Sequence, residues 1–575
     1  MKVSDAISDF ISKKGTCRVF GVSGGASLHL LDSVNRHPGL ILNCVHHEQT
    51  VAMAAESYSR LSSEVGVGIV TSGPGATNLI TGIAGAYYDS VPCVFITGQV
   101  STTRMKGDLG VRQVGFQETP IVDIAKSVTK FAFTVLTPEE VLPTLNKAWS
   151  LAISGRPGPV IIDIPDDIQR MEIEVPRQNL TENTVVTTDS QSHANENVEQ
   201  LLELLRNSRK PIIICGAGIR SSNNSDIVVR RIEQANIPVA LTWGAKDLFP
   251  ASNKMVLGTF GTHGNRVANT VLNSSDLIIS IGSRLDLKAT GSPVASFAPN
   301  AKKIMVDIDS SEIHKFEKFG MKIDLPICLD ISSPEFHILL ERLASFDFQV
   351  EPWKSEILAL KSSMPHEPRQ FDNLGVNPYK LINELSNLAP GDSNIVIDTG
   401  CAVAWTMQEW LVKNGQRLIH DFNNTAMGWS IPAAIASALI SPERLTICLV
   451  GDGSLMMAQH DLSTLSVSKG PVCIFLLNNG GYSMIKQTQD QWFDGDYFAS
   501  SSNVDLHFTD FELLARANNF SYRRIENSDE MVTQIGSILK EKGMIFCEVI
   551  IQSDARVVPI VKFGKPNHQM DPELQ

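Results

Sequence analysis

A glycine-rich turn between two short apolar runs constrains the fold of this chain more than any other feature. Thr446–Val450 is short and apolar enough for a buried strand, and it ends in Gly451-Asp452-Gly453-Ser454. The amphipathic stretch from Leu455 to about Lys469 predicts a helix, which Gly470-Pro471 ends. A second apolar run follows and ends in Asn478-Asn479-Gly480-Gly481. The right-handed crossover of such a unit places Asp452 and Asn479 together at the carboxyl ends of neighbouring parallel strands.

These strand ends offer a set of hard oxygen ligands. A carboxylate from Asp452, an amide oxygen from Asn479 and the carbonyl of Gly481 suit Mg²⁺, which takes a few protein oxygens and completes its shell with phosphate and water. A lone Gly-Asp-Gly is weak evidence, because an ordinary turn with a polar edge can have the same sequence. The Asn pair 27 residues further on makes the metal interpretation the stronger one.

Length and composition restrict the class of protein. A chain of 575 residues implies about three domains, each with its own core. The formal net charge of −13 argues against a nucleic-acid partner. The nine cysteines are widely spaced, which predicts reduced thiols without a disulfide or metal framework. Because the sequence has no apolar stretch of ~20 residues, we expect no membrane partner and a cytoplasmic location.

Alternating strand-like and helix-like segments predict an α/β protein with three doubly wound parallel-sheet domains. We expect domains at 1–172, 196–345 and 376–555 and a C-terminal tail at 556–575, with a polar linker at 173–195 and a weaker, proline-containing linker at 346–375. The first and third domains share a strand, glycine turn, helix, proline and strand. Gly73 to Pro92 and Gly451 to Pro471 are 19 and 20 residues apart, which indicates a distant internal repeat.

The first domain carries a candidate catalytic carboxylate. Glu48 follows His46-His47 and precedes a helix of small residues, so taken alone it would complement a helix dipole. Other motifs follow along the chain. They are Val19–Ala26, Thr71–Asn78, Thr97–Val100, Gly115–Glu118, Ser154–Pro159, Asp398–Gly400 and Met427-Gly428, ahead of the metal motif.

In this order, the motifs resemble those of thiamine diphosphate enzymes, and most closely the large catalytic subunits of the acetolactate synthase branch. The resemblance covers nearly the whole chain and implies a pyrimidine-binding domain, a central Rossmann-like domain and a diphosphate-binding domain. It implies that Glu48 hydrogen-bonds the cofactor's aminopyrimidine, so that the thiazolium carbon can be deprotonated. It also implies sites shared between subunits, and therefore a homodimer at least or a homotetramer.

The resemblance assigns residues to each part of the site. The catalytic residues would be Gly25, Glu48, Phe116 and Gln117. Thiamine diphosphate would be bound by Pro74, Asn78, Gly400, Cys401, Ala402, Met427, Gly451, Asp452, Gly453, Ser454, Asn479, Gly481, Tyr482 and Met484, with Met427 holding it bent and Asp452, Asn479 and Gly481 holding Mg²⁺. The substrate pocket would contain Ser23, Lys288, Ile485 and Thr488.

The central domain resembles the FAD-binding domain of that branch. The corresponding residues are Arg156, Gly216, Ala217, Gly218, Gly261, Arg284 and Asp307. Glycine-rich strand ends can cradle a diphosphate, and an acidic residue can accept hydrogen bonds from ribose. The alternative is a Rossmann-like domain without flavin that serves assembly only.

Departures from acetolactate synthase lie near the substrate. Thr488 stands at the position of a Trp and Lys288 at that of an Arg, and Asp166, Cys401-Ala402 and Ser23 also differ from the branch. Loss of an indole widens a pocket, and Lys cannot reproduce the bidentate fork of Arg on a carboxylate. These changes put the acceptor in doubt and spare the cofactor chemistry.

The sequence therefore predicts a carboligase that decarboxylates a 2-oxo acid, with pyruvate as the expected donor, and transfers the acyl unit to a carbonyl acceptor. A second pyruvate would give acetolactate, but we slightly favour a larger ketone such as a nucleotide-linked keto-sugar. The alternatives are a plain 2-oxo acid decarboxylase and a catalytically silent, cofactor-binding subunit.

Overall fold

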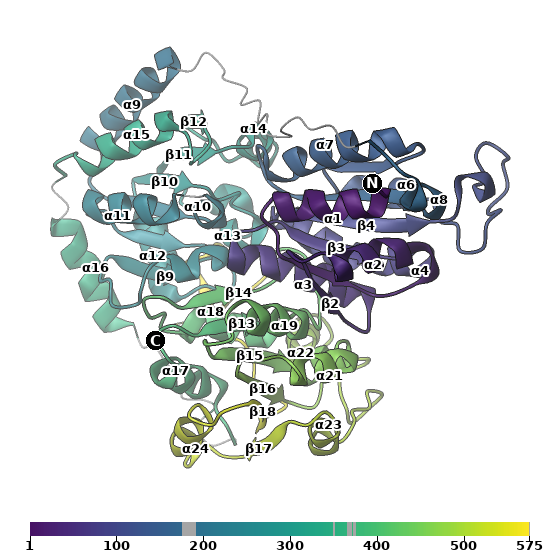
Figure 1. Cartoon of the computed structure of the whole chain (residues 1–575). Coiled ribbons are helices and arrows are strands. Elements are labelled where there is room, and N and C mark those ends of the chain that lie inside the picture. Colours follow the sequence, from purple (N-terminus) through teal and green to yellow (C-terminus); the bar gives the residue numbers. More distant parts are fainter. Residues whose placement is uncertain (175–190, 223, 349–350, 365–370, 372–374, 574–575) are drawn as a thin grey trace.

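Three six-stranded parallel sheets form the chain, each covered by helices on both faces (Figure 1). The computed structural model describes the whole chain except residues 175–190, 223, 349–350, 365–370, 372–374 and 574–575. Among the described residues, no helix has the length and hydropathy needed to cross a bilayer. The predicted α/β architecture of three parallel-sheet domains is confirmed.

The first sheet has the strand order β2-β1-β3-β4-β6-β5. Its strands are β1 Arg18–Gly21, β2 Ile41–Cys44, β3 Gly66–Val70, β4 Cys93–Gln99, β5 Phe131–Thr134 and β6 Pro159–Pro165, and its helices are α1 Val3–Lys13, α2 Leu28–Arg36, α3 Glu48–Ser62, α4 Pro74–Asn78, α5 Ile80–Tyr88, α6 Ile121–Ala125, α7 Val141–Ile153 and α8 Asp166–Arg170. The central strands β3, β4 and β6 are buried along their whole length, as expected for apolar runs covered on both faces.

The central sheet has the order β12-β11-β10-β7-β8-β9, which is the doubly wound Rossmann arrangement. Its strands are β7 Pro211–Cys215, β8 Val239–Leu241, β9 Val256–Thr259, β10 Leu277–Ile281, β11 Lys302–Asp307 and β12 Leu325–Cys328, and its helices are α9 Gln191–Arg206, α10 Ala217–Ser221, α11 Ser225–Ala235, α12 Arg266–Ser274, α13 Leu287–Thr290, α14 Ser310–His314, α15 Pro334–Ala344 and α16 Glu351–Ser363.

The third sheet has the order β14-β13-β15-β16-β18-β17, the same relative order as the first. Its strands are β13 Asn394–Ile397, β14 Arg417–Ile419, β15 Thr446–Gly451, β16 Val472–Asn478, β17 Ser521–Ile525 and β18 Met544–Ile550, and its helices are α17 Pro378–Leu388, α18 Cys401–Glu409, α19 Ser430–Ile440, α20 Asp452–Met456, α21 Leu462–Ser466, α22 Ser483–Trp492, α23 Phe511–Ala517 and α24 Met531–Ile538. This shared topology is what an internal repeat of the first and third domains would give.

Two segments differ from the sequence prediction. The single helix expected from Leu455 to Lys469 is broken into α20, a 3₁₀ turn at Gln459–Asp461 and α21. The break lies where Gly428 packs closely on α20, since a Cβ at Gly428 would be 3.2 Å from Met457 and Ala458. Both linkers between the domains are also shorter in the structure than the sequence predicted. α9 begins at Gln191, and α16 lies within the expected second linker because Trp353 and Ile357 bury their side chains in the central core.

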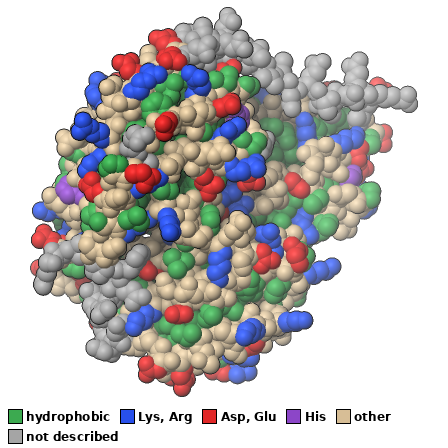
Figure 2. Space-filling model, turned by 90° about the vertical axis from the view of Figure 1, so that its left-hand side faces the viewer, with side chains coloured by type: hydrophobic (Ala, Val, Ile, Leu, Met, Phe, Trp, Pro, Cys, Tyr) green, Lys and Arg blue, Asp and Glu red, His purple; other side chains and the backbone are tan. Residues whose placement is uncertain are grey.

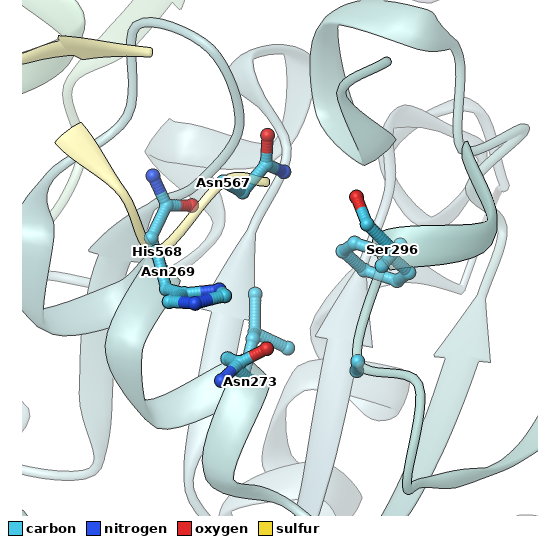
Figure 3. A pocket seen from close by; sticks show the side chains of 8 residues that line it. Asn269, Asn273, Ser296, Asn567 and His568 are labelled. Carbon is cyan, nitrogen blue, oxygen red and sulfur yellow. The ribbon is translucent and has the colours of Figure 1, made fainter. Parts of the chain in front are cut away.

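The C-terminal tail docks on the central domain as a short hairpin, β19 Ile560–Val561 and β20 Met570–Asp571. Asn567 Nδ2 donates to the carbonyl of Ala289 at 2.7 Å. Figure 3 shows Asn567 and His568 beside Asn269 and Asn273 of α12, with a small hollow between them and Ser296. On the face of the molecule in Figure 2, acidic and basic side chains are interspersed.

Candidate active site

The metal motif forms a buried polar corner between β15 and β16. These strands pair in parallel register, with Gly451 opposite Leu477. Asp452 accepts hydrogen bonds from the backbone N–H groups of Gly453 at 2.7 Å, Asn479 at 3.2 Å and Gly481 at 3.0 Å. Burial raises the pKa of Asp452 to about 6, although these N–H groups oppose the shift. The structure therefore brings the two ends of the sequence motif together.

An unpartnered buried acceptor lies in the same corner. Asn479 Oδ1 is buried without a hydrogen-bond partner in the described residues. Such an atom normally has a partner, so it indicates a missing ligand. The described residues contain no cluster of three or more His, Cys, Asp or Glu side chains that could bind a metal. A cation here would therefore depend on one carboxylate with amide and carbonyl oxygens, a set that fits Mg²⁺.

Two glycines beside this corner leave open space. Gly400 follows β13 and Gly451 ends β15, and these strands are neighbours in the third sheet. A Cβ at either glycine would have no atom within 4 Å. Gly400, with φ of +78°, also precedes the first turn of α18. Free backbone N–H groups at such a position can bind phosphate oxygens, so this edge fits a diphosphate.

The loop that carries Met427 is fixed by a buried carboxylate. Asp398 lies at the end of β13 and accepts the N–H groups of Gly428 at 3.1 Å and Ser430 at 2.9 Å. Burial raises the pKa of Asp398, and hydrogen bonds from Ser430 and Ser454 oppose the shift. The neighbouring Met427 is half-buried, and a Cβ at Gly428 would lie 3.2 Å from Met457 and Ala458, just after α20.

The remaining predicted cofactor residues surround the same edge. Cys401 and Ala402 are buried in the first turn of α18, and the Tyr482 ring covers Gly453, where an added Cβ would lie 2.0 Å from the ring. Met484 packs against the core of the third domain.

Glu48 lies in a second polar cluster, in the first domain. It is the first residue of α3, and the His47 ring caps this helix by accepting the Gln49 N–H at 3.0 Å. Asn78 Nδ2 donates to Glu48 Oε2 at 2.9 Å. A Cβ at Gly75 would lie 3.5 Å from Glu48 Oε1, so the Pro74–Asn78 turn borders the carboxyl group.

The first glycine turn and the Gly115–Glu118 motif reach the same cluster. A Cβ at Gly24 would lie 2.4 Å from Thr71, which also accepts the Ala26 N–H at 3.2 Å. Gln117 adopts a φ of +64°, and its Cβ lies 2.9 Å from the position of a Cβ at Gly73. The strand ends of the first sheet thus gather the turns that carry Gly25, Glu48, Asn78 and Gln117.

Phe116 belongs to the segment between β4 and α6, and this segment projects from the first domain at the right of Figure 1. Its side chain is 87% exposed. Glu118 orders this segment by accepting the backbone N–H groups of Lys106 at 2.6 Å and Val114 at 2.8 Å. Partial burial would raise the pKa of Glu118, but these hydrogen bonds lower it.

The expected flavin residues of the central domain have mostly local explanations. A Cβ at Gly216 would lie 2.1 Å from the Gly282 carbonyl, and one at Gly261 would lie 2.2 Å from the Lys288 carbonyl. Arg156 is already paired, with NH1 2.7 Å from Glu312 Oε1 and 3.1 Å from Asp309 Oδ2.

Four of the expected flavin residues remain, and one of them, Ala217, is the first residue of α10. Gly218 also packs on Gly282, and Asp307 accepts the Asp309 N–H at 2.9 Å. Among the seven expected residues, only Arg284 has a buried side-chain atom, Nε, without a hydrogen-bond partner. Close backbone packing thus explains these glycines without a flavin, so FAD stays a prediction.

Comparison with known proteins identifies the family. Three domain models of thiamine pyrophosphate enzymes match: the N-terminal TPP binding domain at 1–126, the central domain at 198–336 and the C-terminal TPP binding domain at 398–549. The chain is 33% identical to the acetolactate synthase large subunit of Lactococcus lactis over 570 residues, covering 99% of this chain and 95% of the relative. The chain belongs to the thiamine pyrophosphate enzyme family, in its acetolactate synthase-like branch.

Plant relatives of the same branch align over the same length. Acetolactate synthase 2 of Zea mays is 32% identical over 98% of this chain and 87% of its own length. Acetolactate synthase of Arabidopsis thaliana is 31% identical over 98% of this chain and 83% of its own length. The expected resemblance is confirmed, and the chain is a thiamine diphosphate-dependent enzyme of the acetolactate synthase type.

The expected substrate-pocket residues lie on three separate parts of the chain. Ile485 and Thr488 lie three residues apart on α22, where both side chains are exposed, and Thr488 Oγ1 donates to the Met484 carbonyl at 3.1 Å. Lys288, on α13 of the central domain, places Nζ 5.4 Å from the centre of the Trp243 ring. Ser23 is exposed beside the first glycine turn.

The sequence prediction missed one contact between the first and third domains. Asp461, in the 3₁₀ turn after α20, accepts the His46 N–H at 2.8 Å and the Thr464 hydroxyl at 2.9 Å. It therefore ties the segment next to the metal motif to the start of α3. The His47 and His460 rings, 5.3 Å apart, lie at the same junction. Only the position of Asp461 shortly after Asp452 could have suggested this link.

Proposed function

We propose that this enzyme decarboxylates a 2-oxo acid, with pyruvate as donor, and joins the remaining acyl unit to a second carbonyl compound. The observation that carries the proposal is the buried corner of Asp452 with the unpartnered Oδ1 of Asn479, beside two open glycine positions. When bound, thiamine diphosphate supplies an acidic thiazolium carbon that can add to a carbonyl group and accept the electron pair released by decarboxylation.

Residues of the third domain bind and orient the cofactor in this proposal. Asp452, Asn479 and the Gly481 carbonyl would hold Mg²⁺, while backbone N–H groups near Gly400 and Gly451 would bind diphosphate oxygens. Met427, Tyr482 and Met484 would hold the rings, and Cys401, Ala402, Gly453 and Ser454 would complete the wall of the site. Asp398 acts indirectly because it fixes the loop that carries Met427.

Residues of the first domain handle protons and orient the substrate. Glu48 would hold the proton for the aminopyrimidine at Oε1, because Oε2 already accepts a hydrogen bond from Asn78. Gln117 and the turn at Gly25 would orient the donor's carbonyl oxygen, and the exposed Phe116 would shield the bound donor from water. Pro74 and Asn78 border the same carboxyl group.

Two copies of the chain would complete each site. Among the described residues, no hydrogen bond or ion pair joins Glu48 or Asn78 to Asp452 or Asn479. We infer a homodimer in which Glu48 of one copy serves the Mg²⁺ and diphosphate half of the other. The exposed Phe116 segment supports this inference, because it projects away from the body of its own chain (Figure 1).

A second 2-oxo acid is the acceptor that we propose first, because the relatives from Lactococcus lactis and Zea mays are named acetolactate synthases. The comparisons give no support to a nucleotide-linked keto-sugar. The exposed Thr488 favours a second candidate, a bulkier 2-oxo acid, since a threonine fills less of the pocket than an indole.

Product analysis tests the proposal. Purified enzyme with thiamine diphosphate and Mg²⁺ is given pyruvate alone, and then pyruvate with 2-oxobutyrate or a longer 2-oxo acid, and CO₂ and ligated products are measured. We expect CO₂ and a ligated 2-hydroxy-3-oxo acid in comparable amounts. Aldehyde as the main product would show a plain decarboxylase, and the absence of CO₂ with every 2-oxo acid would overturn the proposal.

A further inference from the structure

A polar cavity of about 370 Å³ lies at the amino ends of the strands of the third sheet, at the opposite edge from Asp452 and Asn479. It is lined by Leu61, Asn394, Arg417, Ser441, Glu443 and Arg444, among others. Asn394 and Arg417 are the first residues of β13 and β14. Since Gly451 and Asp452 follow the other end of this parallel sheet, the cavity is separate from the proposed active site.

Arg417 enters this cavity with donors to spare. Its Nε donates to Asp247 Oδ2 at 2.9 Å and its NH2 group to the Arg60 carbonyl at 3.2 Å. A guanidinium carries five N–H donors, so several stay available. Asp247 pairs with two arginines, because its second carboxylate oxygen, Oδ1, lies 3.2 Å from NH2 of Arg220. The charge of Arg417 is therefore not fully neutralised by Asp247.

Arg444 supplies a second guanidinium and has no side-chain partner within the part of the chain that the structure describes. It is half-buried in the loop between α19 and β15. The neighbouring Glu443 is exposed and forms no ion pair with it among the described residues. Two guanidinium groups facing one cavity repel each other unless an anion lies between them.

We propose that this cavity binds a small anion that carries a phosphate or carboxylate group, held between Arg417 and Arg444. Planar guanidinium groups match both anions with paired N–H donors. The volume of about 370 Å³ lies near the lower end of ligand pockets, which span about 300–1,000 Å³. Ser441 adds a hydroxyl and Leu61 an apolar wall, so a ligand with a short hydrocarbon part fits.

The proposed site also touches α3. Arg417 binds the carbonyl of Arg60, in the last turn of this helix, and Glu48 is its first residue. The site does not depend on the proposed catalytic function, because none of its residues belongs to the cofactor machinery. A negative test of the anion site would therefore leave the proposed catalytic function unaffected, and a negative test of that function would leave the anion site unaffected.

Calorimetric titration tests the site on enzyme saturated with thiamine diphosphate and Mg²⁺, which blocks the diphosphate site. The probes are inorganic phosphate and succinate, at ionic strength held constant with chloride. We compare wild type with Arg444→Gln and with Arg206→Gln. Arg206 is an exposed arginine on α9, so its substitution changes the net charge equally outside the cavity.

We expect saturable binding of at least one probe to wild type and Arg206→Gln, and at least tenfold weaker binding to Arg444→Gln. Arg444→Lys, which keeps the charge and loses the fork, should bind with intermediate affinity. Phosphate alone or succinate alone would each support the site and identify the group it recognises. Saturation by neither probe, or equal binding to Arg444→Gln and Arg206→Gln, would overturn it.

Discussion

At the residue scale, Arg60 has a buried environment that makes it essential for stability. Its guanidinium, whose side chain is 12% exposed, pairs with Glu56 and Asp89, which are 1% and 2% exposed. Arg60→Met leaves two buried carboxylates uncompensated, so we expect a loss of about 3–5 kcal/mol in unfolding free energy.

Arg36 is the matched control for Arg60, because it also pairs with an acidic residue four positions earlier on a helix. Its ion pair with Asp32 is solvent-exposed, at 53% for each side chain. Arg36→Met should therefore change the unfolding free energy by only about 0–1 kcal/mol. Equal shifts in urea-induced unfolding of the two variants would contradict this account of Arg60.

Asp163 should make stability depend on pH. It lies in the buried strand β6 and accepts hydrogen bonds from Thr97 and Gln99, yet burial raises its pKa to about 7. Between pH 3.8, the ordinary pKa of an aspartate, and about pH 7, Asp163 is therefore protonated in the folded state and ionised in the unfolded state. The contribution of Asp163 to stability is thus lost as pH rises through this range.

Asp163→Asn removes this titration. We expect the unfolding free energy of wild type, relative to this variant, to fall by about 1.4 kcal/mol per pH unit from pH 5 to 7 and to level off above that. Urea unfolding at several pH values measures the difference. A difference that is constant between pH 5 and 8 would show that Asp163 is already charged in the folded protein.

At the element scale, the junction of α3 with the 3₁₀ turn after α20 should set the position of Glu48. Asp461→Ala removes the acceptor for the His46 N–H, so we expect a loss of about 1–3 kcal/mol and faster hydrogen exchange in the first turn of α3. Asp461→Asn keeps an oxygen acceptor and should behave nearly like wild type. Unchanged exchange in Asp461→Ala would mean that other contacts hold this helix.

The strands of the first and third domains could be predicted from sequence, because apolar runs such as Gly66–Val70 and Thr446–Val450 are buried on both faces of a parallel sheet. The break after α20 could not, since it depends on Gly428, far away in sequence. Similarly, α16 mixes polar and apolar residues with a proline, and its place in the fold depends on Trp353, which packs in the core of the central domain. Local patterns contain no information on such tertiary contacts.

The contacts of the sites also divide into those that the sequence predicted and those that it did not. Turn chemistry predicted that Asp452 and Asn479 would meet, because a crossover unit leaves little other choice. Nothing in the sequence indicated that Asp461 would reach His46, or that Arg417 and Arg444 would share a cavity. Those contacts join segments from different domains or loops, so they required the three-dimensional structure.

At the scale of the whole molecule, the first and third domains have the same strand order and carry complementary halves of the proposed site. In the proposed function, the Glu48 half would handle protons and the Asp452 half would bind the metal and diphosphate. If each site combines halves from two copies, variants damaged in different halves should complement each other.

The most direct test is the rate of CO₂ release from pyruvate by Glu48→Gln and Asp452→Asn, each alone and co-expressed. Each variant alone should lose about 10²–10⁴-fold in rate, because one lacks the proton-transfer group and the other a metal ligand. Thiamine diphosphate should still bind to Glu48→Gln. Random co-assembly should restore about a quarter of the wild-type rate, since half of the dimers are mixed and each has one intact site. Wild-type rates for Glu48→Gln alone would contradict the account.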